Sequence, residues 1–460
     1  MMTFPTPTLL IFGPLPAVLL TALLSRRKRV SALAGVLTTA VLIWRVTAVT
    51  LDSSTVPENT RFVADTWLVF GRTLTLTAGI QAFYLFFCFG LVVLFLLALA
   101  WPQGRGFVPA SLLTLSPLAA ALMIAPFEFG AVLLVIAAAC FVLTYRPHAL
   151  TRTYGALRYL LLMVLAMAIL LVVGWLLNSG IAAGLSNWAV QGLIVVTLIV
   201  LAGFPIYIWV QPIVAEASLL VLPFLFGLLQ TAILVFLFNI FQAHPQILQT
   251  ETFSRWMQIG GIGTVLVAAL LATTAARWRD LLAYLLLLNM GMGVLALALP
   301  GAVMWETAVL LHVSRFLSLL MAAGSLSLLT EQGLPSKINA SKTVGWQFPL
   351  STILFVIGLF SLIGFPLSIG FPAQWLLLAA SNATAAVWLP LLLLIGLGGG
   401  VYGVLLAIKQ LWASPKTAPT QQPHRLQWAL GLTLVFILLL GIFPRPIIHY
   451  AAQLASAFLH

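Results

Sequence analysis

Charged residues are scarce in this sequence. Only 7% of its 460 residues are Asp, Glu, Lys or Arg, whereas 62% are hydrophobic, and the mean hydropathy is +1.14. Soluble domains carry roughly 25% charged residues, so these few charges could not cover the surface of a water-soluble fold of this length. The scarcity excludes a soluble protein and indicates that most of the surface faces lipid.

Cysteine is almost absent as well. The two cysteines, Cys88 and Cys140, both lie within apolar stretches, so they can form neither a disulfide framework nor a cluster of metal ligands. No glycine-rich phosphate loop follows a strand, and no flavin, iron–sulfur, haem or quinone motif is found. We therefore predict a chain that holds no cofactor and no metal, with no catalytic residue and no chemistry beyond the movement of ions.

The sequence has long apolar runs instead. They are about 20 residues long, which is the length of helix that crosses about 30 Å of hydrocarbon. We predict an all-α, polytopic membrane protein of about fourteen transmembrane helices. The alternating residues of Thr73–Thr77 predict a short external strand. The expected helix centres are Pro16, Val41, Val92, Ala119, Ile136, Leu165, Val196, Gln230, Val265, Val294, Leu317, Val356, Ile395 and Val435.

The basic residues stand in short loops between the apolar runs. The formal net charge is +12, but the positive-inside rule explains this excess without a nucleic acid partner. When alternate loops are assigned to opposite sides, Arg26–Arg29 and most other basic residues share one side, and most acidic residues share the other. This asymmetry predicts cytoplasmic basic loops, both termini outside the cytoplasm, and a multi-pass location in the bacterial inner (plasma) membrane.

Several motifs carry a resemblance to a known family. Gly203–Trp209, followed by Ala215–Ser218, resembles a signature of the antiporter-like membrane subunits of respiratory complex I (NADH:quinone oxidoreductase). The same family occurs in multisubunit cation/proton antiporters and membrane-bound hydrogenases. Further stretches agree in order and spacing; they are Arg279–Tyr284, Asn289–Gly291, His312 with Ala322–Gly324, Leu362–Pro366 with Gly370–Phe371, and Gly441–Pro444.

The resemblance implies a fold as well as partners. It implies two inverted five-helix repeats, helices 4–8 and 9–13, with helix 7 broken at Pro205 and helix 12 broken at Gly364, Pro366 and Gly370. Interrupted helices in matching halves are also what an ion path through a transporter requires. The partners implied are other membrane-arm subunits and lipid, with quinone reached only through neighbouring subunits. The single membrane domain, 1–460, divides into 1–109 (helices 1–3), 110–240 (first repeat), 257–411 (second repeat) and 426–446 (helix 14).

The ionisable residues of the family are missing from this chain. Members that move protons carry buried acids, lysines and histidines near mid-membrane, because a proton in hydrocarbon needs a titratable group. The matching positions here are apolar at Ala137, Val200, Phe226 and Phe316, and are glutamine at Gln230 and Gln374. Glutamine keeps the hydrogen-bonding reach of such a side chain but cannot titrate.

A few polar residues remain as candidates for a proton or water path, and Glu128 is not one of them. The candidates are His312, Gln230, Gln374, Arg315 and Glu216. His312 is either a neutral histidine that is hydrogen-bonded between helices or a contact for a proton or water. For Arg315 the favoured interpretation is a side chain that snorkels to the external surface or pairs with Glu306, and the alternative is a gate. Glu216 either bonds free backbone amides or has a functional role. Glu128 is interpreted as a solvated carboxylate.

Three functional hypotheses follow. The first is an antiporter-like membrane-arm subunit of a complex I-like assembly, NADH- or ferredoxin:quinone oxidoreductase, that is degenerate in its channel residues and serves a structural or coupling role. The second is an active proton- or cation-translocating subunit of complex I, of a cation/proton antiporter or of a membrane-bound hydrogenase. The third is an independent carrier of an apolar or organic solute.

Overall fold

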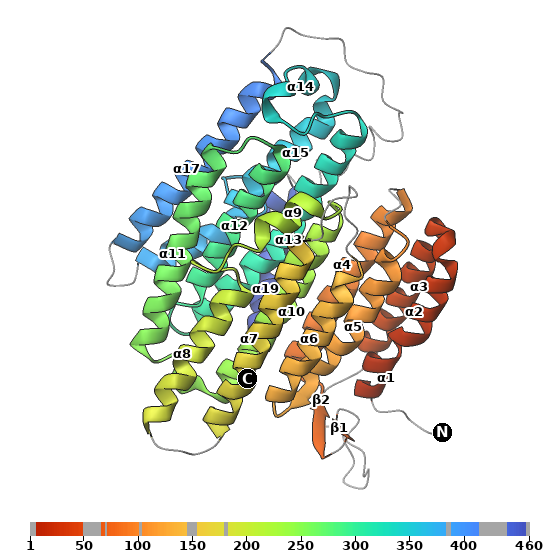
Figure 1. The fold of residues 1–460 in the computed structure, drawn as a ribbon, viewed down its shortest axis with the longest axis vertical. Coiled ribbons are helices and arrows are strands. Elements are labelled where there is room, and N and C mark those ends of the chain that lie inside the picture. The colour runs from red at the N-terminus through yellow and green to blue at the C-terminus, as the bar shows by residue number, and fades with distance from the viewer. Residues whose placement is uncertain are drawn as a thin grey trace.

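The computed structural model describes residues 6–48, 66–69, 71–100, 104–144, 154–178, 183–382, 388–413 and 439–456. Within these ranges the chain is mostly helical, and its long helices run side by side along one direction (Figure 1). Nine helices among the described residues are long and apolar enough to cross a membrane. The chain is therefore a multi-span membrane protein.

The first elements form one edge of the bundle. The chain begins with helices α1 (Thr6–Phe12), α2 (Pro14–Leu23), α3 (Lys28–Thr47) and α4 (Ala78–Ala100). Between α3 and α4 lie strands β1 (Thr66–Val69) and β2 (Arg72–Thr75), which form an antiparallel sheet with β3 (Ile124–Ala125) at one end of the bundle (Figure 1). The strand expected at Thr73–Thr77 is thus confirmed as β2, although the strand ends at Thr75.

Two further groups of helices complete the bundle. The first group is α5 (Phe107–Met123), α6 (Glu128–Val142), α7 (Tyr154–Asn178), α8 (Ala183–Val200), α9 (Val210–Glu216), the π-helix η2 (Pro223–Leu229) and α10 (Gln230–Ala243). The second group is α11 (Glu251–Thr273), α12 (Trp278–Ala296), α13 (Ala302–Glu331), α14 (Val344–Gln347), α15 (Pro349–Ile363), α16 (Phe371–Asn382), α17 (Trp388–Leu411) and α19 (Arg445–Ser456).

The positions of the expected helices agree with those of the structure. The first thirteen expected centres, from Pro16 to Ile395, all lie inside described helices. The last expected centre, Val435, lies outside the described residues. Hydrophobic length predicts these positions well because a bilayer demands internally bonded backbone over a fixed thickness.

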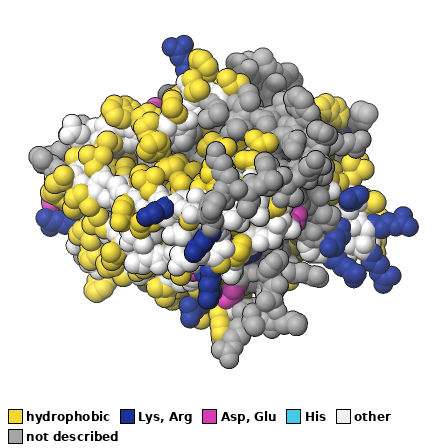
Figure 2. All heavy atoms as spheres, turned by 90° about the horizontal axis from the view of Figure 1, so that it is seen from above, with side chains coloured by type: hydrophobic (Ala, Val, Ile, Leu, Met, Phe, Trp, Pro, Cys, Tyr) yellow, Lys and Arg dark blue, Asp and Glu magenta, His cyan; other side chains and the backbone are white. Residues whose placement is uncertain are grey.

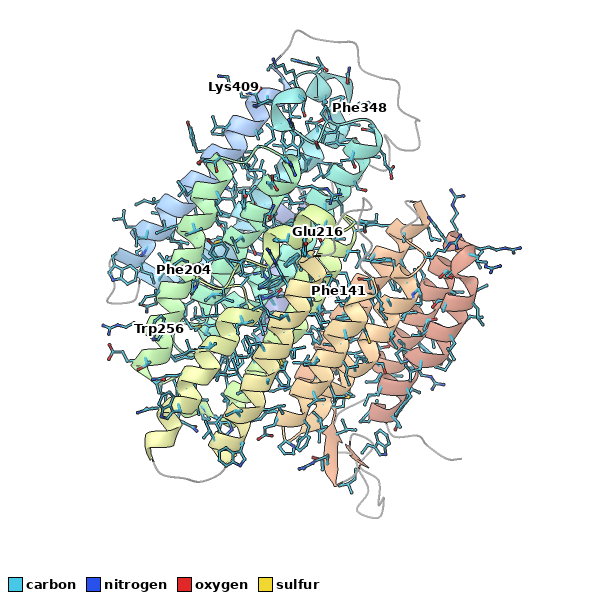
Figure 3. The ribbon with its side chains drawn as sticks, in the orientation of Figure 1. Phe141, Phe204, Glu216, Trp256, Phe348 and Lys409 are labelled. Carbon is cyan, nitrogen blue, oxygen red and sulfur yellow. The ribbon has the colours of Figure 1, made fainter. Side chains whose placement is uncertain are left out.

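Two apolar stretches are interrupted. Helix α8 ends at Val200 and α9 begins at Val210, with Pro205 between them; α15 ends at Ile363 and α16 begins at Phe371, with Pro366 between them. Figure 3 places the labelled Phe204 about halfway along the length of the bundle, away from both of its ends. Proline favours such interruptions because it has no N–H to donate to the preceding turn.

Glycine shapes the second interruption. Gly364 follows α15 in the left-handed conformation, with φ of 77°, which is a common helix ending that favours glycine. A Cβ atom on Gly364 would also lie only 2.0 Å from the side-chain amide carbon of Gln374. Gly370 donates its backbone N–H to Ser361 Oγ at 3.2 Å. The backbone that connects α15 to α16 is therefore tightly packed against neighbouring groups.

The surface agrees with a lipid environment. Hydrophobic side chains spread over much of the face in Figure 2, and Lys and Arg side chains gather at one edge, over the N-terminal helices. Several large apolar side chains on α2, α7 and α11 are well exposed; they are Leu19, Leu161 and Leu270. Such exposure along the sides of long helices is expected where lipid tails are the solvent.

Candidate functional site

Each helix interruption has a buried glutamine beside it. Gln230, the first residue of α10, donates a hydrogen bond from Nε2 to the carbonyl oxygen of Val200. Gln374 on α16 donates from Nε2 to the carbonyl oxygen of Leu362 at 3.4 Å. The last carbonyls of a helix lack partners in their own helix. The two glutamines therefore cap the helices that end at the interruptions.

A polar cluster extends from the second interruption into α12 and α13. Arg315 on α13 donates from Nε to Asn289 Oδ1 at 2.7 Å and from Nη2 to the carbonyl oxygen of Asn289 at 3.3 Å. Asn289 on α12 donates in turn from Nδ2 to the carbonyl oxygen of Leu362 at 3.0 Å. Hydrogen bonds thus join α13, α12 and α15, and Gln374 on α16 shares the same carbonyl acceptor.

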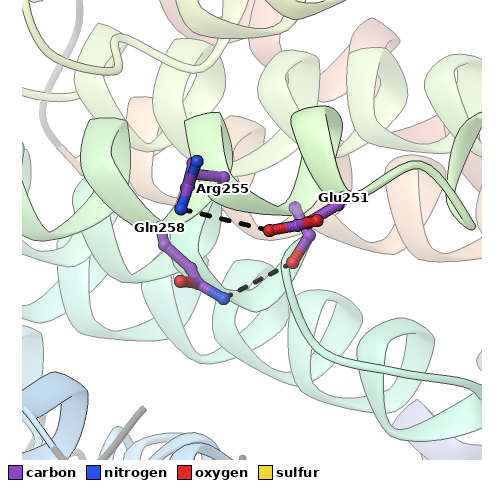
Figure 4. A network of polar contacts seen from close by, with 4 residues as sticks. Glu251, Arg255 and Gln258 are labelled. Atoms are coloured by element: carbon purple, nitrogen blue, oxygen red, sulfur yellow. Dashed lines mark hydrogen bonds and ion pairs between the residues drawn. The ribbon is translucent and has the colours of Figure 1, made fainter. Parts of the chain in front are cut away.

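The expectation that Arg315 snorkels to the surface or pairs with Glu306 is wrong. The residue is 1% exposed, because Asn289 offers two acceptors in the interior. Among the described residues, the one ion pair joins Arg255 to Glu251 at 4.0 Å, and these side chains are 72% and 89% exposed (Figure 4). Arg315 is therefore a buried cation with neutral hydrogen-bond partners.

His312 lies one turn before Arg315 and is fully buried. Its Nδ1 is 2.8 Å from the carbonyl oxygen of Ala308. A carbonyl oxygen only accepts, so Nδ1 carries the hydrogen, and Nε2 of the neutral ring is then a free acceptor. Nε2 has no hydrogen-bond partner among the described residues. The ring thus bonds within its own helix and not between helices.

His312 and Arg315 approach the same point of α12. A Cβ atom added at Gly293 would lie 3.0 Å from Arg315 Nη2 and 3.4 Å from His312 Cε1. The absence of a side chain at Gly293 therefore leaves room for both groups against α12. This brings the two basic residues of the sequence-based site together with Asn289.

The sequence-based site omitted the partners that complete the cluster. Asn289 was part of a motif but was not assigned as a partner of Arg315, and Ser318 and Ser361 were not singled out. Ser318 Oγ lies 2.7 Å from Ser361 Oγ, and this contact joins α13 to the end of α15. The only local signal was an isolated amide or hydroxyl inside an apolar run, which does not identify its partner.

The corresponding interior of the first group of helices contains aromatic rings. Phe226 stacks on Trp209 at 5.6 Å between ring centroids, and Trp209 lies 5.3 Å from Tyr159. Tyr159 and Phe224 both contact Phe141, which is labelled in Figure 3. All five side chains are fully buried, and none of these five residues is an acid, a lysine or a histidine.

The other positions where the resemblance led us to expect ionisable residues are buried too. Ala137 and Val200 are both fully buried. Phe316 packs edge-on against Phe86, with 5.7 Å between the ring centroids. A Cβ atom added at Gly227 would lie 2.6 Å from the Phe316 ring. These side chains fill the space that a longer ionisable group would need.

Glu216 belongs to a different place, at the end of the short helix α9. Its Oε2 accepts a hydrogen bond from the backbone N–H of Gly155, at the start of α7, at 3.1 Å. On the other side, Gln211 donates to Asp280 on α12 at 2.9 Å. Arg279 Nη1 also donates to three carbonyl oxygens at the end of α9, at 3.2, 3.3 and 2.7 Å; these belong to Val214, Ala215 and Ala217.

These contacts favour the structural interpretation of Glu216, because it bonds a backbone amide. They also attach α9 to both α7 and α12. The interpretation of Glu128 as a solvated carboxylate is wrong, since the residue is 8% exposed. A Cβ on Gly174 of α7 would lie 2.0 Å from the Glu128 side chain, so that side chain packs against α7.

No protein-family profile matches this chain. Among curated proteins it is similar to subunit N of the NADH-quinone oxidoreductase of Chromohalobacter salexigens, with 24% identity over 257 residues, 54% of this chain and 53% of that protein. The protein of the same name from Methylococcus capsulatus is 25% identical over 259 residues, 54% of this chain and 52% of that one. The chain spans about half the length of the curated relatives that it matches.

Solved structures share the fold over nearly the whole chain. A chain of the membrane-bound sulfane sulfur reductase, an archaeal respiratory membrane complex, superposes with a TM-score of 0.79 at 15% identity, covering 99% of this chain and 98% of that one. A chain of the Mrp complex from Dietzia sp. gives 0.77 at 14%, covering 99% and 97%. A chain of Thermus thermophilus respiratory complex I gives 0.70 at 19%, covering 96% and 98%.

Proposed function

We propose that this chain, as an antiporter-like membrane subunit, is part of the membrane arm of a larger complex. The complex is a complex I-like NADH- or ferredoxin:quinone oxidoreductase. The names of its curated relatives and the multisubunit complexes that share its fold support this assignment. Its partners are then other membrane-arm subunits and lipid. Quinone and redox cofactors belong to those neighbouring subunits.

The finer architecture is part of the proposal. The chain has fourteen core helices in a bacterial inner membrane, with both termini outside, and helices 4–8 and 9–13 form inverted repeats. The two interruptions, between Val200 and Val210 and between Ile363 and Phe371, support the repeats. The glutamine cap beside each interruption is further support, because Gln230 and Gln374 bond the ending helices in the same way.

The proposed role is structural and coupling, without independent pumping. The observation that carries this role is the interior itself: aromatic rings fill it in the first group of helices, and the polar cluster of the second group has one histidine, one arginine and neutral amides. A proton pump needs a succession of titratable groups whose proton affinities can be switched by their neighbours. Phe226 and Phe316 stand where such groups are expected.

The contacts of α9 support the coupling part of the role. Arg279 and Asp280 begin α12, yet they bond the short helix that follows the first interruption. A shift of α12 would therefore displace α9 as well. This connection lets the two groups of helices move as a unit between neighbouring subunits.

Translocation of a proton or cation through this subunit is the alternative. The observation that favours it is His312, whose Nε2 is an unpartnered acceptor inside a hydrogen-bonded polar cluster, among the residues that the structure describes. A water molecule there would connect the imidazole to Arg315. This half of the chain is the one where a path would have to lie.

The test is the number of protons moved per electron by the assembled complex. Under the proposed role, the variant His312→Ala combined with Gln230→Ala leaves this ratio unchanged, because neither residue relays protons. The measurement uses the purified complex in liposomes, with electron flow and internal pH recorded together. The variant Gln249→Ala, at an exposed position, is the control for assembly. A loss of at least half a proton per electron, which is one proton per electron pair, would support the alternative instead.

A further inference from the structure

Arg315 lies deep within the longest described helix. Helix α13 runs from Ala302 to Glu331, so at 1.5 Å per residue Arg315 is about 20 Å from either end. An ionisable side chain at such depth is rare and costly, and it has a function by default. Its guanidinium stays protonated, because arginine does not lose its proton in proteins. The structure thus holds a permanent positive charge near mid-membrane.

Among the residues that the structure describes, no acidic side chain lies beside this charge to offset it. Its described partners are the amide oxygen and carbonyl oxygen of Asn289, which are neutral. The acids of α12 and α13 are Asp280, Glu306 and Glu331, and each is nine or more residues along the helix from Asn289 or Arg315, roughly 14 Å. The positive field of the guanidinium therefore reaches the polar cluster with little compensation.

His312 is the group on which this field acts. It lies on the same face of α13, three residues before Arg315, and both side chains approach Gly293. Residues three apart on a helix have Cβ atoms about 5–6 Å apart. A proton on the His312 ring, or a metal ion beside it, would therefore place a second positive charge roughly that far from the guanidinium. At an effective dielectric constant of about 20, this repulsion lowers cation occupancy on the order of a hundredfold.

The neighbouring helices provide little that could reverse this effect. The elements η2, α10, α15 and α16 pack against α13 and contain no acid, base or histidine. Three other helices pack on it, α4, α12 and α19. Their ionisable residues are Tyr84, Cys88, Arg279, Asp280, Tyr284, Arg445, His449 and Tyr450. The α12 charges lie in its first turn, and α19 adds no acid.

We propose that Arg315 is an electrostatic plug, a specificity-determining residue that excludes protons and metal cations from the polar cluster around His312, and that Asn289 positions it. The inference rests on the proposed function, in which the chain moves no cation. It adds a physical reason why no cation passes: the charge of Arg315 excludes cations from the second group of helices, whereas aromatic rings fill the interior of the first group. A fixed cation inside a narrow polar region is a known way for a pore to reject protons.

The experiment measures proton entry into liposomes that contain the full-length chain. A potassium gradient with valinomycin drives protons inward, and a trapped pH-sensitive dye reports them. Liposomes with the wild type should admit protons no faster than empty liposomes, whereas Arg315→Met should raise the rate of proton entry at least tenfold. Arg315→Lys keeps the charge and should stay tight. Adding His312→Phe to Arg315→Met should abolish the leak, because the titratable group is then gone.

The control variant is Arg255→Gln, which removes an exposed arginine from the surface pair in Figure 4 and should not leak. The variant Arg315→Met leaves Asn289 Oδ1 and the Asn289 carbonyl oxygen without their donor, which lowers stability. Arg315→Gln, which keeps an amide donor, is therefore measured as a second variant. If liposomes with the wild type, Arg315→Met and Arg315→Gln all admit protons no faster than empty liposomes, the proposed role of Arg315 is wrong and the proposed function still stands. A wild type that conducts protons overturns the proposed function itself.

Discussion

At the scale of single residues, the two buried glutamines have a role that needs no titration. Each donates an amide hydrogen to a carbonyl oxygen released where a helix ends. A backbone carbonyl left without a donor inside a bilayer is unfavourable by several kcal/mol. A side chain with a permanent donor therefore suits these positions under the proposed role, in which the chain does not pump.

The two caps should differ in importance. Gln374 shares its acceptor, the Leu362 carbonyl, with Asn289 Nδ2, so Gln374→Leu leaves that carbonyl bonded. We expect Gln230→Leu to lower the free energy of unfolding by about 1–3 kcal/mol, and Gln374→Leu to lower it by less. Thermal unfolding in detergent, followed by tryptophan fluorescence, measures the difference. Gln249→Leu makes the same change at an exposed position. A larger loss for Gln374→Leu would contradict the capping interpretation.

At the scale of elements, the short helix α9 depends on residues outside itself. It has seven residues, Val210–Glu216, and isolated helices of that length are unstable. Arg279 bonds the carbonyl oxygens at its end, Gln211 bonds Asp280, and Glu216 bonds Gly155. Helices α12 and α7 thus stabilise the segment that follows the first interruption.

Removal of the arginine should release this segment. In Arg279→Ala the carbonyl oxygens of Val214, Ala215 and Ala217 lose their donor. We expect the amides of α9 to exchange hydrogen at least tenfold faster, while those of α12 change little. Hydrogen–deuterium exchange with mass spectrometry gives the rates. The control is Arg277→Ala, an exposed arginine two residues earlier. Unchanged exchange in α9 would show that its packing alone holds it.

At the scale of the whole molecule, the distribution of charge predicts an orientation. Lys409 and Phe348 lie at one end of the bundle in Figure 3, and Trp256, next to Arg255, lies nearer the other. The basic loops, including the one after α17, are expected in the cytoplasm. We therefore expect the end that carries Arg255 to face outward.

Cysteine labelling in intact cells tests this orientation. In a background with Cys88→Ala and Cys140→Ala, a membrane-impermeant maleimide should label Arg255→Cys and should spare Lys409→Cys. Opening the cells should make Lys409→Cys reactive, which confirms that the site is accessible from the cytoplasm. The reverse pattern would place the basic loops outside, contrary to the positive-inside rule.

The sequence by itself determined the class of the protein and the approximate places of its helices. Bilayer thickness sets a required apolar length, and this requirement acts within each segment, so centres such as Val41 and Leu165 could be located without any partner. The interruptions near Pro205 and Pro366 were also local, because a missing N–H and a left-handed glycine act within one turn. Motif order supplied the resemblance that the shared fold later supported.

Only the tertiary structure decided how the polar side chains are satisfied. Arg315 stays in the interior because Asn289 on another helix offers it two oxygens, and no pattern within α13 contains that information. The ring cluster joins Phe226 of η2, Trp209 just before α9, and Tyr159 of α7. Hydrogen bonds and ring contacts between distant segments depend on which helices are neighbours, and that choice is made by the packing of the whole chain.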